Sequence, residues 1–315
     1  MRTVRLRRPS TLLVPLVAVA FGVAACGADA PEVSSAAVEP TSASVTATST
    51  PTASGVKTPS AEAGKPDDPP GPRTLPAGHV HAVSTDPGTG DVLVATHGGL
   101  YVFGNGEPRR VGPSIDLMGF TVAGSNHYLA SGHPGPGVDL PQPVGLIESR
   151  DGGQTWKVLS RGGSSDFHAL DAAEGNVVGF DGAIKVSADG RSWKAGNLTS
   201  PPRALAVSPD GRRVLATTAD GLMSSTDGGA RWSPVEGAPP LLLVDWAEGE
   251  SVAGLGTDGQ VHVSTDGGMT WRRTSITAPN VQAMAVARKP GRLWVLMATD
   301  SQLVTADVGD AAQSD

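Results

Sequence analysis

Residues 264–271 read STDGGMTW, and close variants occur three more times, as SRDGGQTW (149–156), SADGRSW (187–193) and STDGGARW (225–232). Paired glycines allow the positive φ angles of a tight hairpin. The aspartate can accept hydrogen bonds from N–H groups of its own turn, and the tryptophan can cover a junction with a neighbouring sheet. Each part of this box has a local structural task, so we expect four structural hairpins rather than four active sites. The alternative, a calcium loop, needs more than one carboxylate per box.

The residues expected to carry this structural task are Ser149, Asp151, Trp156, Asp189, Trp193, Ser225, Asp227, Trp232, Ser264, Asp266 and Trp271.

The boxes repeat with a regular period. Their tryptophans are separated by 37, 39 and 39 residues, which indicates a repeat architecture. In the clearest unit, residues 204–208, 213–218, 222–225 and 231–235 read as four short strands separated by tight turns. Four such strands form one blade of a β-propeller. The sequence therefore predicts an all-β fold.

Two degenerate units flank the four clear ones. Residues 81–103 contain three strands without a box, and residues 284–310 contain three strands with a decayed box. We expect a single β-propeller of six four-stranded blades over residues 77–310, followed by a tail at 311–315, with seven blades as the open alternative. The last unit lacks a fourth strand, which the stretch from Arg73 to Gly78 can supply to close the ring.

The N-terminus has the pattern of a secretion signal. Four arginines precede an apolar run from Thr11 to Ala25, which ends in VAAC at Cys26, the single cysteine of the chain. This ending resembles the lipobox of bacterial lipoproteins, and the resemblance implies that Cys26 carries a diacylglyceryl group. A plain secretory signal is the alternative. We expect residues 1–25 to be a lipoprotein signal peptide.

Residues 26–76 are dominated by Ser, Thr, Ala and Pro. Such a segment buries too little apolar surface to offset the entropy of ordering, so we expect a disordered linker. Together with a lipidated Cys26, it predicts an extracytoplasmic protein anchored to the outer face of the bacterial cytoplasmic membrane.

The charge of the chain limits its partners. The formal net charge is −7, and it becomes −11 when residues 1–25, with four arginines and no acids, are removed. An acidic body argues against nucleic acid as a ligand. We expect a monomer whose partner is a glycan or an extracytoplasmic protein.

The boxes resemble the Asp-box, or BNR, repeats of the bacterial sialidase superfamily, and the pattern S-x-D-G-G-x-T-W is intact at 149–156 and 264–271. HVHAV (79–83), ASGHPGPG (130–137) and DFHAL (166–170) are similar to lipoprotein propellers of high-GC bacteria. That group generally bears the label glycosyl hydrolase or exo-sialidase. The resemblance implies a β-propeller and makes glycoside hydrolysis the alternative function.

The sialidase machinery does not carry over to this sequence. Sialidases use a late tyrosine nucleophile and an early arginine motif, whereas no tyrosine follows Tyr128 and the motif is missing. Another glycosidase would need two carboxylates that face each other. Asp139, Asp166 and Asp245 are the candidates for such a pair. We expect a protein without catalytic activity, and a glycosidase is the alternative.

The histidines indicate where a ligand binds, because five of the seven fall on one predicted face in the first three units. The candidate ligand-binding residues are His79, His81, His97, His133, Asp139, Asp166 and His168. His79 and His81, two residues apart on a strand, point to the same side. With His168 as third ligand they would suit a divalent transition metal such as zinc or copper; His97 or His133 could replace His168. The alternative is that the histidines hydrogen-bond to loop backbones or to a polar ligand.

The sequence therefore predicts an exported, membrane-anchored β-propeller that binds a ligand, a metal or a protein through the histidine-rich face of blades 1–3.

Overall fold

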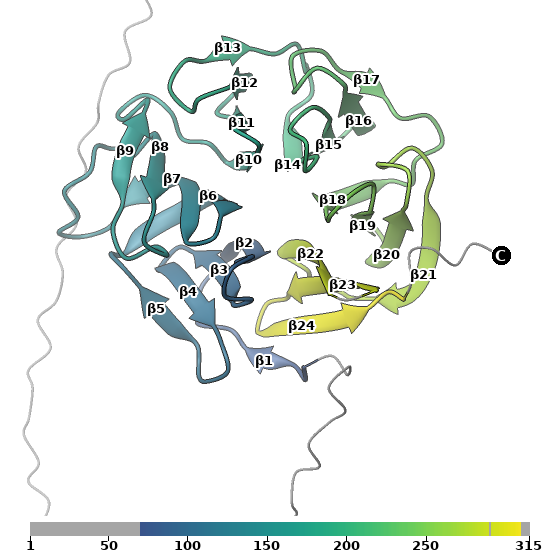
Figure 1. Cartoon of the computed structure of the whole chain (residues 1–315), viewed down its shortest axis with the longest axis horizontal. Helices are drawn as coiled ribbons and strands as arrows, with labels where there is room; N and C mark the ends of the chain where they lie inside the picture. The colour runs from purple at the N-terminus through teal and green to yellow at the C-terminus, as the bar shows by residue number, and fades with distance from the viewer. Residues whose placement is uncertain (1–69, 290, 310–315) are drawn as a thin grey trace, which may run out of the picture. The chain divides into compact units, whose positions relative to one another are not determined.

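The computed structural model describes residues 70–289 and 291–309. These residues form six four-stranded antiparallel sheets that surround a central axis as the blades of a propeller (Figure 1). The predicted all-β fold with six blades is confirmed. The predicted signal peptide, Cys26, most of the predicted linker and the tail at 311–315 lie outside the described residues. Within these residues, no helix is long and apolar enough to cross a membrane.

The blades follow the chain in order. Blade 1 contains β2 (Val80–Thr85), β3 (Val92–Thr96), β4 (Gly99–Phe103) and β5 (Arg109–Val111); blade 2 contains β6 (Ile115–Gly124), β7 (His127–Pro134), β8 (Leu146–Ser149) and β9 (Lys157–Ser160); blade 3 contains β10 (Ala169–Ala173), β11 (Asn176–Phe180), β12 (Ile184–Ser187) and β13 (Lys194–Ala195).

The second half of the ring repeats this order. Blade 4 contains β14 (Pro202–Val207), β15 (Val214–Thr218), β16 (Gly221–Ser225) and β17 (Ser233–Pro234); blade 5 contains β18 (Leu241–Trp246), β19 (Val252–Gly256), β20 (Gln260–Ser264) and β21 (Arg272–Thr277); blade 6 contains β22 (Ala283–Lys289), β23 (Arg292–Ala298), β24 (Gln302–Asp307) and β1 (Arg73–Thr74).

The ring closes where β1 completes blade 6. Arg73 pairs with Leu303 and Thr74 with Gln302, so the predicted closure by the stretch after Arg73 is confirmed. Closure uses residues that the sequence pattern assigned to the end of the linker, because a two-residue strand has too little length to show an alternation of polar and apolar residues. The ring therefore begins at Arg73 rather than at residue 77.

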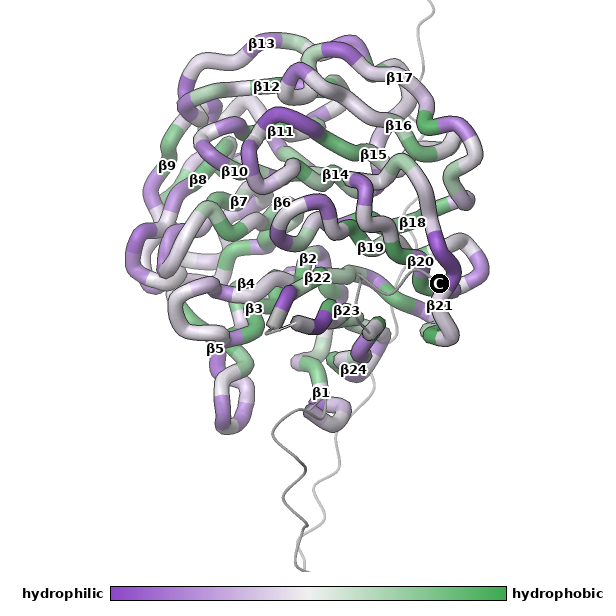
Figure 2. Tube along the Cα trace, turned by 45° about the vertical axis from the view of Figure 1, so that its right-hand side comes forward, coloured by the Kyte–Doolittle hydropathy of each residue, from purple (hydrophilic) through white to green (hydrophobic). Residues whose placement is uncertain are grey.

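The first strand of each blade lines the centre of the ring, and neighbouring first strands contact each other (Figure 1). Apolar side chains from adjacent blades share common clusters: one cluster joins Leu100 of blade 1 to Ile147 of blade 2, and another joins Leu255 of blade 5 to Val295 of blade 6. In Figure 2 the hydrophobic colour lies mainly on the strands and the hydrophilic colour mainly on the turns. The core is thus a set of layers between blades.

The boxes connect the third and fourth strands of blades 2–5, and blade 5 shows the contacts. Ser264 Oγ accepts a hydrogen bond from Gly268 N at 2.8 Å and donates one to Asp266 Oδ1 at 2.7 Å. Asp266 also accepts bonds from the backbone N and the hydroxyl of Thr270, at 2.9 and 2.6 Å. Gly268 has φ 86°, which its lack of a Cβ permits. Trp271 Nε1 donates to Gly268 O at 2.9 Å. The hydrogen bonds of this box are therefore used within the hairpin.

Candidate functional site

A recurring bulge shapes one end of the central channel. In four blades the pairing of the first two strands shifts register by one residue, at His81, Met118, Arg203 and Leu242. A bulge inserts an extra residue and turns its side chain away from the ladder. The same position of four blades therefore presents an imidazole, a thioether, a guanidinium and an isobutyl group.

The channel itself is a cavity of about 240 Å³. His79, His81 and His168 line it together with Met118 and Arg203. The candidate face predicted from the sequence is therefore continuous with the channel of the ring.

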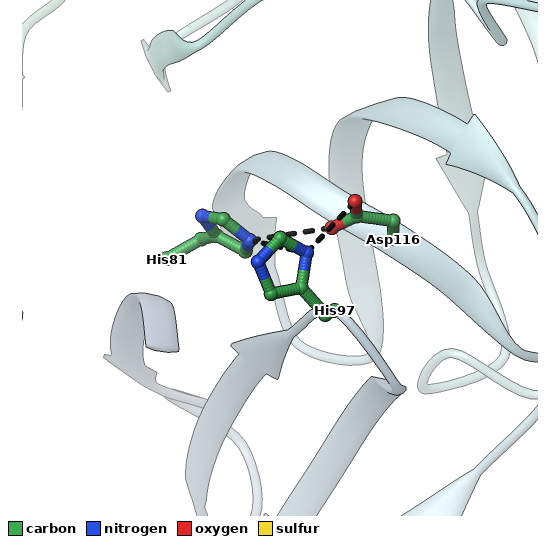
Figure 3. Close-up of side chains that lie close together, drawn as sticks. All are labelled: His81, His97 and Asp116. Carbon is green, nitrogen blue, oxygen red and sulfur yellow. Dashed lines mark hydrogen bonds and ion pairs between the residues drawn. The ribbon is translucent and has the colours of Figure 1, made fainter. Parts of the chain in front are cut away.

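Three side chains from two blades converge beside this channel (Figure 3). His81 lies in β2, His97 lies in the turn between β3 and β4, and Asp116 lies in β6 of the next blade. His81 Nε2 is 3.2 Å from Asp116 Oδ1, and His97 Nδ1 is 2.9 Å from Asp116 Oδ2. The two ring nitrogens are 3.4 Å apart. One ligand atom from each residue lies within 4.8 Å of the others, so this triad could hold a metal ion.

The separation of the two ring nitrogens in the triad fits tetrahedral coordination. Two nitrogen ligands at 2.0–2.1 Å from a zinc ion, at the tetrahedral angle, are about 3.3 Å apart. The two ring nitrogens are 3.4 Å apart, close to that edge length, and each of them lies near a different oxygen of Asp116, His81 Nε2 at 3.2 Å from Oδ1 and His97 Nδ1 at 2.9 Å from Oδ2. Asp116 Oδ1 is buried and accepts no hydrogen bond of acceptable geometry, although a buried carboxylate oxygen ordinarily has a donor. The donor set and its geometry therefore fit a metal.

Burial keeps one of the imidazoles neutral. The side chain of His81 is 8% exposed, whereas that of His97 is 52% exposed. Burial lowers the pKa of His81 to about 4, and it outweighs the opposite effect of the Asp116 carboxylate. Above that pH His81 is neutral, and Nε2 can offer a lone pair when Nδ1 carries the proton.

A second cluster centres on Asp166, between blades 2 and 3. His133 Nε2 lies 3.1 Å and His168 Nε2 lies 3.5 Å from Asp166 Oδ2. His168 Nδ1 also lies 3.1 Å from the backbone oxygen of Asp166, and His133 Nδ1 lies 3.0 Å from Gln142 Nε2. Asp166 Oδ1 is buried without a hydrogen-bond partner. The described residues outside the first triad include no other group of three whose ligand atoms are as close together.

The structure divides the predicted site residues between these two clusters. The predicted metal set joined His79 and His81 to His168, but His168 belongs to the Asp166 cluster. His79 stays beside the triad, with ring centroids 5.0 Å from His81 and 5.9 Å from His97. Asp139 is exposed and makes no ion pair or side-chain hydrogen bond with any described residue.

The carboxylate that completes the triad, Asp116, was not among the predicted site residues. Asp116 stands two residues before the bulge at Met118, in the apolar run Ile-Asp-Leu-Met (115–118). It lies before the part of the first strand that can be aligned among the repeat units, so the alignment did not include it. One aspartate in an apolar run is the sequence signal that could have found it.

Two further carboxylates line the channel and connect blades. Asp171 accepts hydrogen bonds from Thr121 Oγ1 and from the backbone N of Val207, each at 2.6 Å. Asp245 accepts one from the backbone N of Val286, also at 2.6 Å. Burial, with a smaller contribution from the Asp171 charge, raises the pKa of Asp245 to about 7.

Comparisons with known proteins agree with this architecture. A family model described as BNR/Asp-box repeat matches residues 262–273, which contain the box of blade 5. No curated protein matches the chain in sequence. The chain is therefore a β-propeller with BNR/Asp-box repeats, as predicted.

Solved structures with similar folds include two kinds of protein. YCF48 bound to a D1 peptide has a TM-score of 0.50 and 16% identity, over 80% of this chain and 99% of that chain. A GH74 enzyme of Niastella koreensis has a TM-score of 0.47 and 17% identity, over 77% of this chain and 37% of that chain. At such identities the likeness concerns the fold alone.

Proposed function

We propose that this protein is an exported binding module, anchored to the outer face of the bacterial cytoplasmic membrane through Cys26. Its histidine-rich face holds a divalent transition metal, zinc or copper, at His81, His97 and Asp116. The single observation that carries the metal proposal is the convergence of three side chains from two blades, one ligand atom from each lying within 4.8 Å of the others and the two ring nitrogens 3.4 Å apart.

The kind of metal follows from the donors. Two imidazoles and one carboxylate favour zinc or copper over magnesium or calcium, which prefer sets of oxygen ligands. Three protein ligands leave a further coordination position for water or for a donor from a partner. His97 is half exposed, so the site is accessible from solvent.

The partner proposed for this face is an extracytoplasmic protein or a glycan. YCF48, which shares the fold, is known in complex with a D1 peptide. A propeller ring of this kind is therefore compatible with a peptide partner, and a metal with an open position would provide one point of attachment.

Glycoside hydrolysis is the second candidate function, and one observation favours it. Asp245, with its pKa raised to about 7, could act as a general acid near the Asp171 carboxylate in the channel. We rank it second because both carboxylates accept backbone hydrogen bonds from the following blade. These hydrogen bonds between neighbouring blades give both carboxylates a structural role.

Zinc binding to the chain from Gly27 to Asp315 tests the metal proposal. This chain retains β1, which a shorter version starting after Thr74 would lose. Isothermal titration with Zn²⁺ and with Cu²⁺, after treatment with a chelator, should give one site per chain, and Asp116→Asn or His97→Ala should abolish it. His127→Ala is the matched control. His127 is the first residue of β7, it pairs with Glu148, and it makes no contact with the triad. A chain that binds neither metal, or an unchanged site in Asp116→Asn, contradicts the proposal.

The anchor has a separate test. The full chain, expressed in a bacterium that exports lipoproteins, should partition into the detergent phase and should be labelled by radioactive palmitate. Cys26→Ala should move it to the aqueous phase without label. Equal partition of the two proteins would refute the anchor and would leave the metal site untouched.

A further inference from the structure

A second cavity opens on the same end of the ring, between blades 4 and 5, and the metal proposal makes no use of it. Its volume is about 400 Å³, within the range of sites that hold small molecules. Two of the bulged residues, Arg203 of blade 4 and Leu242 of blade 5, line it. We call it the Arg203 groove.

The walls of the Arg203 groove are largely apolar. Pro201, Ala219, Pro240 and Leu241 line it together with Leu242. Leu241 is buried and Leu242 half-buried, whereas Pro201, Ala219 and Pro240 are exposed. Apolar walls of this kind select a ligand with an apolar group, because water held against them is released on binding.

Three threonines line the groove, and the hydroxyl groups of two of them are occupied by internal hydrogen bonds, whereas Thr257 is exposed. Thr217 Oγ1 donates to Leu242 O at 2.8 Å and accepts a bond from Ala204 N at 3.1 Å. Thr218 Oγ1 donates to Gly221 O at 2.9 Å. The part of a ligand that enters the groove therefore needs no polar group to match Thr217 and Thr218, and the exposed Thr257 can keep its contact with water.

Arg203 is the one cation that lines the Arg203 groove, and it lines the central channel as well. Its side chain is exposed and makes no hydrogen bond or ion pair with any described residue. The nearby Asp220, in the turn between β15 and β16, accepts a hydrogen bond from the Ser200 hydroxyl instead. Some other arginines of the ring are paired, such as Arg213 with Glu250 and Arg292 with Asp307. Arg212 is also exposed and without a side-chain partner among the described residues, but it does not line a cavity with apolar walls.

An unpaired guanidinium at the edge of an apolar cavity matches a particular chemistry. The planar fork of an arginine fits a carboxylate through two parallel hydrogen bonds. We propose that the Arg203 groove binds an apolar carboxylate, with the carboxylate on Arg203 and the apolar group between Leu242 and the two prolines. A free carboxylic acid and the C-terminus of a peptide that ends in an apolar residue share this chemistry.

Two pairs of probes separate these sources. One pair is 4-phenylbutanoate and the neutral 4-phenylbutanol; the other is an N-acetylated tripeptide ending in leucine, with a free C-terminus and as the amide. Titration of the chain from Gly27 to Asp315, in the presence of a metal chelator, measures each affinity. We expect at least one carboxylate to bind roughly tenfold more tightly than its neutral partner.

Variants assign the binding to the groove. Arg203→Gln should remove the preference for the carboxylate, and Ala219→Phe, which fills the groove from an exposed turn, should remove binding altogether. Arg212→Gln, an exposed arginine in the turn between β14 and β15 of the same blade, should change nothing. The thermal unfolding of each variant shows that the ring is intact.

The pattern of results decides the proposal independently of the metal. Binding of the free acid alone, or of the peptide alone, identifies the source of the carboxylate. Absence of binding by all four probes, or equal affinity of acid and neutral partners, refutes the Arg203 groove as a carboxylate site. A preference for the carboxylate that persists in Arg203→Gln refutes it as well. None of these results affects zinc binding at the triad, which contains no groove residue.

Discussion

His81 Nε2 in β2 lies 3.2 Å from Asp116 Oδ1 in β6, across the boundary between blade 1 and blade 2. The two residues belong to different sheets, and no strand pairing holds them together. Their contact therefore exists only when the two blades are docked, so the site reports on the assembly of the ring. This relationship leads directly to the first prediction.

Zinc should stabilise the ring by joining two blades. At a free zinc concentration of 100 times the Kd, linkage predicts about 2.7 kcal/mol of added stability against unfolding. Denaturant titration with and without zinc measures it. The increment should vanish in Asp116→Asn, whose stability without metal should stay close to that of the parent chain. An equal increment in Asp116→Asn would mean that zinc binds elsewhere.

His168→Ala should leave the zinc affinity within about twofold of the parent value. The reason is that the Nε2 atom of His168 lies against Asp166, at 3.5 Å, in the other cluster. The same titration that tests the triad measures this variant. A tenfold loss would instead support the set predicted from the sequence, in which His168 is a ligand.

Asp245 should make stability fall as pH rises. Its folded pKa is raised to about 7 from an ordinary value near 4, so the folded ring holds a proton that the unfolded chain has released. The stabilisation is present below pH ~4 and is lost between pH ~4 and ~7. Asp245→Asn removes this dependence, and its amide oxygen can still accept the hydrogen bond from Val286 N.

At pH 8 we therefore expect Asp245→Asn to be more stable than the parent by about 1–3 kcal/mol. Denaturant unfolding of both proteins at pH 4, 6 and 8 checks this. The stability of the variant has to be compared with that of the parent at each pH, because His81 also makes stability depend on pH. Burial lowers the pKa of His81, so its contribution has the opposite sign and stability is lost as pH falls from ~6.5 to about 4. A parallel pH profile for the two proteins would contradict the prediction.

The box of blade 5 should prove structural. Asp266→Ala removes the acceptor for the Thr270 backbone and hydroxyl groups, and we expect a loss of about 1–2 kcal/mol in the free energy of unfolding. Glu236→Ala, an exposed residue with no partner among the described residues, is the control. Zinc affinity should be unchanged in both. An Asp266→Ala protein of parental stability would argue that the box has another task.

Aryl glycosides should not be turned over by this protein. Asp166 is engaged by two histidines, and Asp171 and Asp245 are hydrogen-bonded to backbone N–H groups of neighbouring blades. A panel of nitrophenyl glycosides, assayed with and without zinc, provides the measurement. Turnover that Asp245→Asn abolishes would reverse the order of the two proposed functions, and turnover lost in Asp139→Asn or Asp166→Asn would place the acid on the rim.

Much of the fold could be predicted because the repeat unit is local. Five of the six blades are four consecutive strands. Their turns, their alternation of polar and apolar residues and their boxes therefore appear within about 40 residues of sequence. The same locality favoured six blades, with seven left open until the structure showed six sheets, and the incomplete last unit indicated that the stretch from Arg73 to Gly78 closes the ring. The exact start of the ring at Arg73 could not be predicted, because β1 has only two residues.

The site was predictable only in outline. Five of the histidines of blades 1–3 could be assigned to one face from their place in the repeat, and three of them, His79, His81 and His168, line the channel. Their grouping could not be predicted, because the bulges at His81 and Met118 change which side chains turn inward. A shift of one residue reverses the face of a strand, and nothing in a short apolar run marks where it occurs.

The sequence by itself determined the all-β repeat and the hairpins that hold the blades, and it favoured six blades over seven, since these features depend on turn chemistry and on contacts between neighbours along the chain. Only the tertiary structure decided that Asp116 joins His81 and His97, that His168 joins Asp166 and that Arg203 stays unpaired. The physical reason is that these relationships arise where separate sheets dock and where bulges re-aim side chains. Both depend on the packing of the whole ring rather than on any one segment.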